Sequence, residues 1–422
     1  MKTRVRHLPL GSLVQAQTAK AFGEKDSARP YIGLEHLAQG QPVLLGSAPS
    51  SESISVNSVF EIGDILFGKL RPNLRKCAAA PFPGYCSTDI LVLRSREDVD
   101  PDFAACVLQS EAVFAAAVES AVGTKMPRTN WDALASTSVF APADRDEQRT
   151  IALVLKGIDR AIEQTEALLA KQQRIKTGLM HDLLTRGLDA QGHLRDPSTH
   201  RFKKSPLGSV PADWSGTNIG NLATLVTSGP RGWARYYSNA GAKFIRIGNL
   251  TREHVNFRLQ DMQFVSPPEG AEGNRTQLMQ GDVLFSITAD LGVIGLVPAD
   301  FGPAYINQHI ALIRPNTGDV VPGWLANFLA SHWIQKWISN INESGAKAGL
   351  NLPTINGVPI TVPKLPEQQM IAEILALCDR QIAEIYSRIA KLRRLKTGLM
   401  HDLLTGRVAV TPLLAEAGSG NH

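Results

Sequence analysis

Two long stretches of the chain carry apolar residues at alternating steps of three and four positions. The first contains Ile151, Leu155, Ile158, Ile162, Leu169, Leu179 and Leu183, and the second contains Ile371, Leu375, Cys378, Ile382, Ile385, Ile389, Leu392, Leu399 and Leu403. This heptad spacing is typical of a seam against another helix. Pro142 and Pro363 precede the stretches and Gly187 and Gly406 lie near their ends, as helix start and stop signals do. We predict helices within 142–187 and 363–407, each about 60 Å long at roughly 40 residues and 1.5 Å per residue.

The two predicted helices are copies of each other. The ten residues KTGLMHDLLT occur at 176–185 and again at 396–405, an offset of 396 − 176 = 220. At the same offset, Glu147-Gln148 recurs as Glu367-Gln368. Internal repeats decide the architecture of a chain. Because the two predicted helices have retained so many identical residues, we expect both to contact the same kind of partner.

The remaining sequence forms two diverged halves with a common plan. In residues 1–141 we predict strands near 31–34, 64–67, 89–94 and 139–141, a helix at 104–118 and a loop at 123–130. Residues 214–362 repeat this order: GDVLF at 281–285 matches GDILF at 63–67, a helix at 324–341 matches 104–118, and a loop at 345–351 matches 123–130. Residues 188–213 are rich in Pro and Gly and predict a linker, and 408–422 predict a loose tail.

Composition narrows the class of protein. The chain has 422 residues, of which 43% are apolar and 20% charged, so we expect a globular protein of several domains. It contains no apolar run of the roughly 18 residues that a membrane span needs. Cys77, Cys86, Cys106 and Cys378 lack metal-ligand spacing, and we interpret them as free thiols in the cytoplasm. The net charge of +5 mildly favours a polyanionic partner.

The duplicated motifs in this order resemble the specificity subunit of a type I restriction–modification system. The resemblance rests on the GLMHDLLT helix ends, the Glu-Gln helix starts, the Gly-Asp-Ile/Val-Leu-Phe strands and the Gly-x-Lys…Asn loops, and it covers essentially the whole chain. It implies an α+β fold: two pseudo-repeated mixed α/β target-recognition domains separated by two long antiparallel coiled-coil helices. It also implies a bipartite asymmetric DNA target, and partners that comprise two methyltransferase subunits and, through them, restriction and translocase subunits.

The sequence contains no motif that indicates catalysis. An adenine methyltransferase needs an Asn/Asp-Pro-Pro-Tyr/Phe loop for the flipped base, and the only Pro-Pro here lies in Ser266-Pro267-Pro268-Glu269. No phosphate-binding loop of the Gly-x-x-x-x-Gly-Lys-Ser/Thr type occurs. His181-Asp182 and His401-Asp402 are interpreted as polar groups at helix ends. We expect no catalysis, cofactor or metal; the alternatives are a stand-alone DNA adenine methyltransferase and a coiled-coil scaffold that binds no DNA.

If the chain binds DNA, the diverged halves must supply the contacts. Lys and Arg contact phosphates, Arg reads guanine, and Asn or Gln reads adenine. The candidates are Lys69, Arg71, Asn73, Arg75, Lys125, Arg128 and Asn130 in the first half, and Arg231, Arg235, Tyr236, Thr288, Lys347 and Asn351 in the second. The alternative for each is a solvated surface side chain. Lys125 and Lys347 stand out because they recur at matched loop positions.

Basic residues also gather late in each predicted helix. They are Lys171, Arg174 and Lys176 in the first, and Lys391, Arg393, Arg394 and Lys396 in the second. Three interpretations remain open: contacts with phosphates between the half-sites, interaction with the helix dipole, or pairing with a partner.

Overall fold

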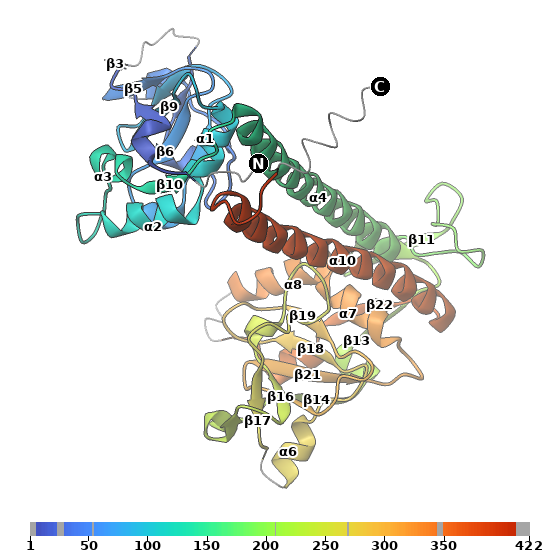
Figure 1. The fold of residues 1–422 in the computed structure, drawn as a ribbon. Coiled ribbons are helices and arrows are strands. Elements are labelled where there is room, and N and C mark those ends of the chain that lie inside the picture. The colour runs from blue at the N-terminus through green and yellow to red at the C-terminus, as the bar shows by residue number, and fades with distance from the viewer. Residues whose placement is uncertain are drawn as a thin grey trace, which may run out of the picture. The chain divides into compact units, whose positions relative to one another are not determined.

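The protein divides into two compact units. Figure 1 shows the computed structural model, which describes residues 6–22, 29–52, 55–206, 208–267, 270–343 and 349–410. Unit 1 comprises Met1–Thr165 and Arg388–His422, and unit 2 comprises Glu166–Ser387. Each unit therefore contains one diverged half of the sequence together with part of both long helices.

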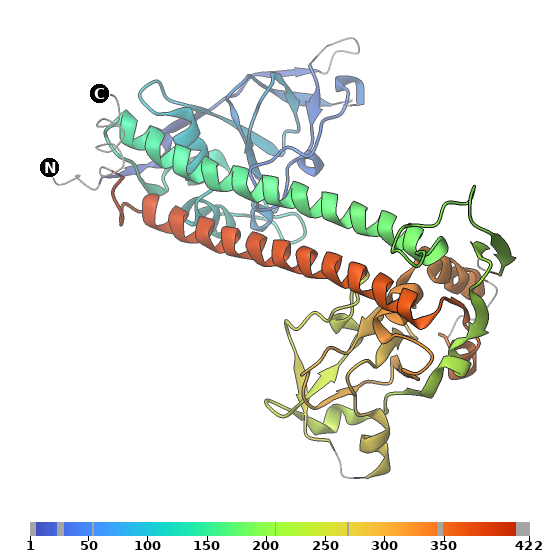
Figure 2. The same ribbon diagram turned by 90° about the vertical axis from the view of Figure 1, so that its right-hand side faces the viewer.

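The two long helices are present and run antiparallel. They are α4 (Arg145–Thr185, 41 residues) and α10 (Leu365–Leu403, 39 residues), side by side in Figures 1 and 2. In unit 1, Asp159 of α4 lies 2.5 Å from Lys396 of α10; in unit 2, Lys176 lies 2.5 Å from Asp379. Asp159 comes before Lys176 in α4, but its partner Lys396 comes after Asp379 in α10. The two helices therefore run in opposite directions. The predicted pair of antiparallel helices is confirmed.

The repeated Glu-Gln pair begins each helix for a structural reason. Gln148 donates from Nε2 to the carbonyl of Pro142 (2.9 Å) and accepts at Oε1 from the N–H of Asp100 (2.8 Å). Gln368 makes the two equivalent bonds in unit 2, at 2.9 and 2.7 Å. Both glutamines are buried, and each ties the start of a long helix to the segment before a shorter one. At the helix end, Gly406 has φ 71° and a Cβ there would lie 2.6 Å from the Phe140 ring, so glycine is required.

Unit 1 contains two four-stranded sheets. The first has the order β2-β9-β6-β7, all antiparallel, with bounds Val14–Ala16, Ile90–Ser95, Ile65–Gly68 and Cys77–Ala79. The second has the order β3-β5-β8-β4, with bounds Lys20–Phe22, Val56–Phe60, Gly84–Cys86 and Tyr31–Ile32, and its β4–β8 pair is parallel. In addition, β1 (His7–Pro9) pairs with β10 (Ser138–Phe140).

The first sheet is the middle layer of unit 1. Ile65 and Phe67 of β6 belong to the core shared with α4, which includes Ile151 and Leu155. Leu66, between them, belongs to a separate core with residues of the second sheet. Successive side chains of a strand point to opposite faces, so a continuous apolar strand is what a middle layer requires.

Unit 2 repeats this plan with one change. Its first sheet, β14-β21-β18-β19, has the bounds Ala223–Ser228, Ile310–Pro315, Val283–Ser286 and Ile294–Leu296. Its second, β15-β17-β16-β20, has the bounds Tyr237–Ser238, Gln263–Val265, Ala242–Ile245 and Ala304–Ile306. The parallel pair is now β16–β20, and β17 joins it on β16, whereas β5 of unit 1 joins β8. As in unit 1, the first strand, β13 (Ser215–Asn218), pairs with the last, β22 (Pro359–Val362).

A carboxylate fixes the first sheet in each unit. Asp64 accepts two hydrogen bonds from Arg94 (2.6 and 2.8 Å) and one from the N–H of Glu61 (2.8 Å). Asp282 accepts two from Arg314, both at 2.8 Å, and one from a backbone N–H at 2.7 Å. The side chains of Asp64 and Asp282 are each 1% exposed. We call these two residues the frame carboxylates.

The shorter helices correct one prediction. Residues 104–118 were expected to be one helix, but α1 (Pro101–Leu108) and α2 (Glu111–Glu119) are separate because Ser110 caps the second. Residues 324–341 likewise divide into α7 (Pro322–Ala330) and α8 (His332–Glu343). The remaining α-helices among the described residues are α3 (Trp131–Ala135), α5 (Ile219–Leu222), α6 (Ala271–Thr276) and α9 (Leu352–Asn356). No single helix in this part of the chain is long and apolar enough to cross a membrane; α1 and α2, bent by 51°, pass that test only together.

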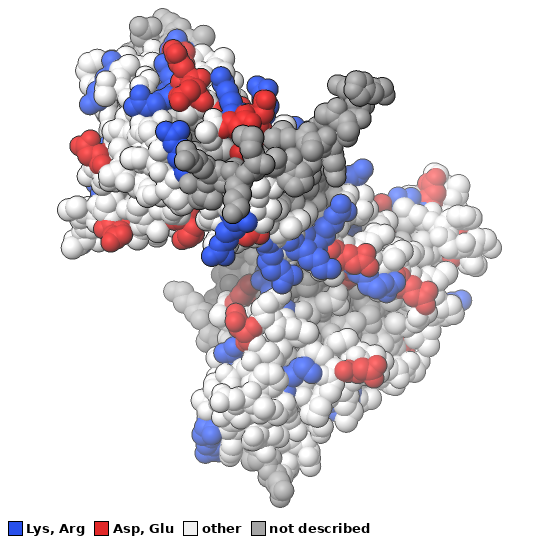
Figure 3. All heavy atoms as spheres, in the orientation of Figure 1, with Lys and Arg blue, Asp and Glu red and all other residues white. Residues whose placement is uncertain are grey.

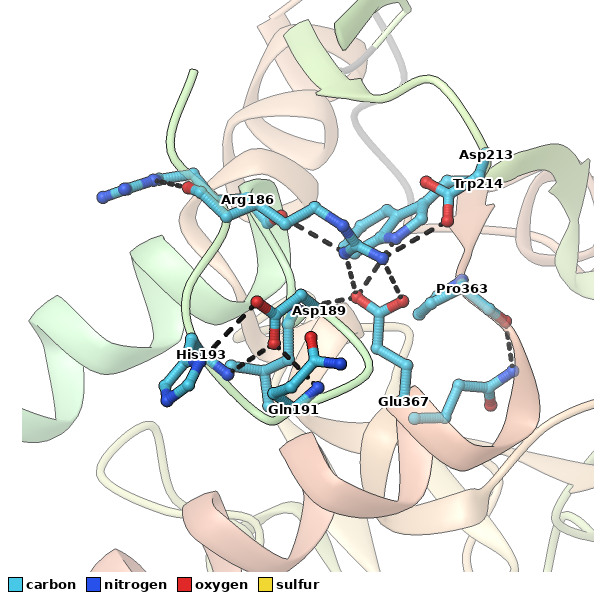
Figure 4. Close-up of polar contacts among 11 residues, drawn as sticks. Arg186, Asp189, Gln191, His193, Asp213, Trp214, Pro363 and Glu367 are labelled. Atoms are coloured by element: carbon cyan, nitrogen blue, oxygen red, sulfur yellow. Dashed lines mark hydrogen bonds and ion pairs between the residues drawn. The ribbon is translucent and has the colours of Figure 1, made fainter. Parts of the chain in front are cut away.

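The predicted linker, 188–213, is more ordered than its composition indicated. It contains a hairpin of β11 (Phe202–Ser205) and β12 (Gly208–Pro211). Its Arg195 makes two hydrogen bonds, at 2.5 and 3.0 Å, with the carboxylate of Glu367, which also accepts from the N–H of Leu188 and from Trp214 (Figure 4). The repeated Glu of the Glu-Gln pair thus anchors this segment in unit 2. The loose tail prediction fails at Val410, which is buried in unit 1; residues 411–422 lie outside the described residues.

Candidate nucleic-acid interface

In unit 1, three segments meet just beyond the end of β6. The N–H of Lys69 donates to the carbonyl of Asp89 (3.0 Å), and the carbonyl of Lys69 accepts from the N–H of Thr129 (3.0 Å). Two residues on, the N–H of Arg71 donates to the carbonyl of Pro127 (2.8 Å). Backbone bonds therefore bring the predicted basic turn and the predicted loop together. We call the side chains of Lys69, Asp89 and Arg128 edge site 1.

Asp89 holds the guanidinium of Arg128 at two points. Nε of Arg128 lies 2.8 Å from Oδ1 and Nη2 lies 2.9 Å from Oδ2. The hydrogen bond from Arg128 lowers the pKa of the Asp89 carboxyl below its usual range, and the charges of Arg128 and Lys69 add to this. The pair is consequently ionised at neutral pH. It remains accessible, since 41% of the Arg128 side chain is exposed.

The other candidates of unit 1 differ in what they already contact. Arg71, Asn73 and Lys125 are exposed. Arg75 pairs with Glu111 at 2.5 Å and lies over the ring of Phe114. Asn130 is exposed too, but its Oδ1 accepts from the N–H of Ala133 (2.9 Å) and caps α3. That carbonyl oxygen is the atom an Asn needs for a two-point contact with adenine, so Asn130 is more simply explained as a helix cap.

Unit 2 repeats the backbone arrangement of edge site 1. The N–H of Ile287 donates to the carbonyl of His309 (2.9 Å), and the carbonyl of Ile287 accepts from the N–H of Leu350 (2.9 Å). Ile287 therefore occupies the position of Lys69, and His309 that of Asp89. The side chains differ: Thr288 Oγ1 lies 2.7 Å from His309 Nδ1, and Gln308 Nε2 lies 2.9 Å from His309 Nε2. We call Thr288, Gln308 and His309 edge site 2.

The side chains of edge site 2 form a chain of hydrogen bonds from Gln308 through His309 to Thr288. An amide nitrogen only donates, so Nε2 of His309 accepts from Gln308 and the ring proton sits on Nδ1. Nδ1 then donates to the oxygen of Thr288, whose hydroxyl proton is left to point elsewhere. Beside His309 lies a hollow of about 460 Å³, lined by Arg246, Ile247, Gly248, Asn249, Gln260, Asp261, Asn307 and His309.

The remaining candidates of unit 2 are less connected. Arg231 and Arg235 are exposed, and Arg235 lies 4.8 Å from the ring centre of Tyr236, which is half-buried. Asn351 caps α9 through the N–H of Thr354 (2.8 Å), as Asn130 caps α3. Lys347 lies outside the described residues, so its match with Lys125 is untested.

The basic residues of the long helices fall into two groups. Lys176 and Lys396 pair with Asp379 and Asp159, which settles those two in favour of a contact within the protein. Lys171, Arg174, Lys391 and Arg394 are exposed, as is Arg393. Figure 3 shows Lys and Arg side chains gathered over α10. The exposed group stays a prediction of contact with phosphates or with a partner.

His181 and the buried cysteines, which were weighed as catalytic groups, have contacts and burial that a structural role explains. The ring of His181 stacks on Trp333, with the ring centres 6.0 Å apart. Burial raises the pKa of the Cys86 and Cys106 thiols to about 12, so both are protonated. Among the described residues, no three His, Cys, Asp or Glu side chains group as a metal site.

Sequence reasoning missed Asp89, Gln308 and His309. The offset of 220 residues already aligned Ile90 with Ile310 in the strand that follows. Carried one position back, it aligns Asp89 with His309. The signal in the sequence was that an aspartate in one half aligns with a histidine in the other, directly before a strand that both halves share.

Comparison with known proteins gives consistent relatives. Residues 211–394 match the domain family described as type I restriction modification DNA specificity domain. Over 212 residues the chain is 28% identical to the putative type I restriction enzyme MjaX specificity subunit of Methanocaldococcus jannaschii, a match that covers 48% of either protein. Over 301 residues it is 23% identical to the MjaVIII specificity subunit of the same organism, covering 69% of this chain and 67% of the relative. The match thus spans about half the length of the first relative.

Solved structures agree in fold along the whole chain. The type I restriction–modification S subunit from M. genitalium aligns with a TM-score of 0.62 and 14% identity, covering 96% of both chains. A chain from a study of complex assembly and conformational transition of the type I R-M system aligns with a TM-score of 0.54 and 19% identity, covering 94% of this chain and 97% of that one. The expected α+β architecture is confirmed. The matched domain, the curated relatives and the duplicated motifs all support a specificity subunit of a type I restriction–modification system.

Proposed function

We propose that this DNA specificity subunit recognises a bipartite, asymmetric DNA target, one half-site for each unit. The observation that carries the proposal is the pair of edge sites. Matching backbone hydrogen bonds hold Lys69 in unit 1 and Ile287 in unit 2, yet the side chains around them differ in charge and shape. Two copies of one frame with different exposed side chains suit the reading of two different sequences, because base edges are distinguished by side-chain donors and acceptors.

The long helices are proposed to dock two methyltransferase subunits and, through them, restriction and translocase subunits. A repeated exposed face supports this: Lys171, Arg174, Ile175 and Gly178 of α4 recur as Lys391, Arg394, Leu395 and Gly398 of α10. Ile175 and Leu395 are 42% and 51% exposed, so folding alone does not explain these apolar residues. Two copies of one surface suit two copies of one partner.

Glycines on these faces allow a clean test of docking. A Cβ added at Gly178 or Gly398 meets no atom within 4 Å, so Gly178→Glu and Gly398→Glu should fold normally. We expect each single variant to lose one methyltransferase subunit per chain and the double variant to lose both, measured by native mass spectrometry. Gly157→Glu is the matched control, since Gly157 also has open space on α4 but aligns with Leu377 on α10. Full assembly of the double variant would rule out this face.

The helix pair is further proposed to set the gap between half-sites. Inserting one heptad after Leu169 and one after Ile389 preserves the seam and adds about 10 Å. DNA advances about 3.4 Å per base pair, so the gap should widen by one to three base pairs while the half-sites stay the same. An active complex that kept the original gap would mean that another feature sets it.

Methylation mapping tests the function as a whole. In cells that express the chain with its partner subunits, we expect modified adenines in a split motif with a gap of fixed length. We also propose a cytoplasmic location and no catalysis by the chain alone. The two alternatives make opposite predictions: a stand-alone methyltransferase would transfer methyl groups from labelled S-adenosylmethionine when pure, and a scaffold without DNA binding would leave duplex DNA unshifted in a gel.

A further inference from the structure

Three Arg–Asp pairs among the described residues make two hydrogen bonds each. Arg94 with Asp64 and Arg314 with Asp282 occupy equivalent positions and hold the first sheet of either unit. The third, Arg128 with Asp89, occurs in unit 1 only. Unit 2 has His309 in place of Asp89 and, one residue before Leu350, Gly349 in place of Arg128.

The third pair is not part of the frame that the two units share. In unit 2 the same backbone bonds form without it, from Ile287 to His309 and from Leu350 to Ile287. Its burial also differs from that of the frame carboxylates: the Asp89 side chain is 24% exposed, whereas that of Asp64 is 1% exposed. An exposed, oriented guanidinium that one unit has and the other lacks is a feature of recognition rather than of the frame.

The guanidinium of Arg128 has one edge left for a ligand. Asp89 takes Nε and one hydrogen of Nη2, and Nη1 makes only a 3.4 Å contact to the carbonyl of Met126. A guanidinium has five N–H donors in a rigid plane, so the Nη1–Nη2 end still presents two parallel donors. In the major groove, guanine presents two acceptors, O6 and N7, at a spacing that such a fork matches.

We propose that Arg128 reads a guanine in the half-site bound by unit 1, and that Asp89 is the positioning residue that orients the guanidinium. The inference rests on the proposed DNA recognition and names the ligand of edge site 1. Lys69 is half-buried in the same site, and Arg71 and Lys125 are exposed on the same two segments. They supply the positive charge that phosphates on either side of the guanine require.

The test uses the full chain assembled with its methyltransferase subunits. Methylation mapping on DNA with each half-site position randomised is repeated for the wild type, Arg128→Ala and Arg128→Lys. In Arg128→Ala, one guanine of one half-site should become degenerate, with a loss of preference of roughly 5- to 150-fold, the worth of one good two-point contact. The other half-site and the gap should not change. Arg128→Lys should still bind DNA but should retain only part of the preference for guanine, because an ammonium lacks the two parallel donors of a guanidinium.

Asp89→Asn tests the positioning role. It keeps the backbone carbonyl that accepts from Lys69 but removes the charge that holds Arg128. The preference for that same guanine should fall, by less than in Arg128→Ala, with the thermal unfolding midpoint unchanged. Lys125→Ala is the matched control from the same loop, and it should weaken all sequences equally.

The outcomes separate this inference from the proposed function. A wild-type complex that methylates no split motif would overturn both. A split motif that survives Arg128→Ala with every base preference intact, or a uniform loss for all sequences as from a phosphate contact, would overturn the guanine assignment alone. A variant with a lowered unfolding midpoint is replaced by Arg128→Gln, in which the same guanine must still lose its preference if the assignment is right.

Discussion

The two units share the design of the first sheet but differ in the strand pairing of the second sheet. Their first sheets have the same strand order, and both are fixed by a frame carboxylate. Their second sheets do not: β5 adds to β8 in unit 1, whereas β17 adds to β16 in unit 2. The first sheet packs against the long helices, and the second does not share that core. The layer next to the shared helices is preserved, and divergence increases away from it.

The edge sites show the same division within a few residues. Their backbone hydrogen bonds are alike, so the positions of the side chains are set by the frame. The side chains themselves form an ion pair in unit 1 and a chain of hydrogen bonds through His309 in unit 2. The backbone frame is therefore kept while the side chains it presents differ between the two units.

The largest effect should come from the frame carboxylates. Asp64→Ala or Asp282→Ala removes two charge-assisted hydrogen bonds and one backbone bond, and leaves an arginine without its partner. We expect each to lower the free energy of unfolding by about 3–5 kcal/mol. Asp282 should cost more, since Arg314 is 22% exposed and Arg94 is 43% exposed. Urea unfolding checks this, with the exposed Asp98→Ala as control; equal curves for Asp282→Ala and the control would contradict the role of the frame.

The ion pairs between the long helices should differ between the units. The side chains of Lys176 and Asp379 are 6% and 3% exposed in unit 2, but those of Lys396 and Asp159 are 16% and 28% exposed in unit 1. Lys176→Met leaves a buried carboxylate unpaired and should cost about 3 kcal/mol. Lys396→Met should cost only about 1 kcal/mol, because water still reaches Asp159. Replacing Asp379 by Leu as well should restore most of the loss, and a double variant as unstable as the single one would contradict this.

In unit 2, a tyrosine of α10 links the two long helices to the segment that contains Glu253. Tyr386 donates to Glu253 Oε2 (2.7 Å) and accepts from Gln173 (3.0 Å), and Lys176 reaches the carbonyl of Glu253 at 3.3 Å. On α4 the position equivalent to Tyr386 is Glu166, so this contact is particular to one unit. Tyr386→Phe should lower the free energy of unfolding by about 1 kcal/mol. The exposed Tyr237→Phe serves as control and should have no effect.

The same contact predicts a pH dependence. Burial, together with the hydrogen bond to Glu253 and its charge, raises the pKa of Tyr386 to about 12, above the ordinary value near 10. Between these values the folded chain holds a proton that the unfolded chain has released, so stability falls as pH rises. The contribution is fully present below pH 10 and is lost by about pH 12. The difference in unfolding free energy between wild type and Tyr386→Phe should therefore narrow over this range; a constant difference would contradict the raised pKa.

The smallest effect concerns a single exposed lysine. Lys125→Ala should leave stability unchanged and weaken DNA binding by the complex at low salt. If Lys125 neutralises one phosphate, the slope of log affinity against log salt should become less steep by about one. An unchanged slope would remove this loop lysine from the interface.

Much of the fold could be predicted because the chain contains an internal repeat, so that each half could be compared with the other. The offset of 220 residues identified both long helices, and the matched Gly-Asp strands identified the first sheets. The breaks at Ser110 and Ser331 were missed because apolar periodicity continues across them. The hairpin in the linker was missed because β11 buries no residue and neither strand carries an alternating apolar pattern.

The site was harder to predict because its contacts join distant segments. Asp89 meets Arg128 across 39 positions, and no local pattern announces this. Lys176 and Lys396 resembled DNA contacts, although each faces a carboxylate on the other long helix. The sequence shows that a helix residue is basic. Which group it pairs with depends on how the helices pack, and the sequence alone does not show this.

The most direct measurement of the central claim uses only this chain. Residues 217–362 are put in place of residues 8–141, which begins the exchange at equivalent positions of the first strands, β1 and β13, and ends it before a long helix. The chimera is expressed with its partner subunits and its methylation sites are mapped. If each unit reads its own half-site, the first half-site should disappear and the second should occur twice, at the original gap. A motif that keeps the first half-site, or that changes in both, would contradict independent reading by the two units.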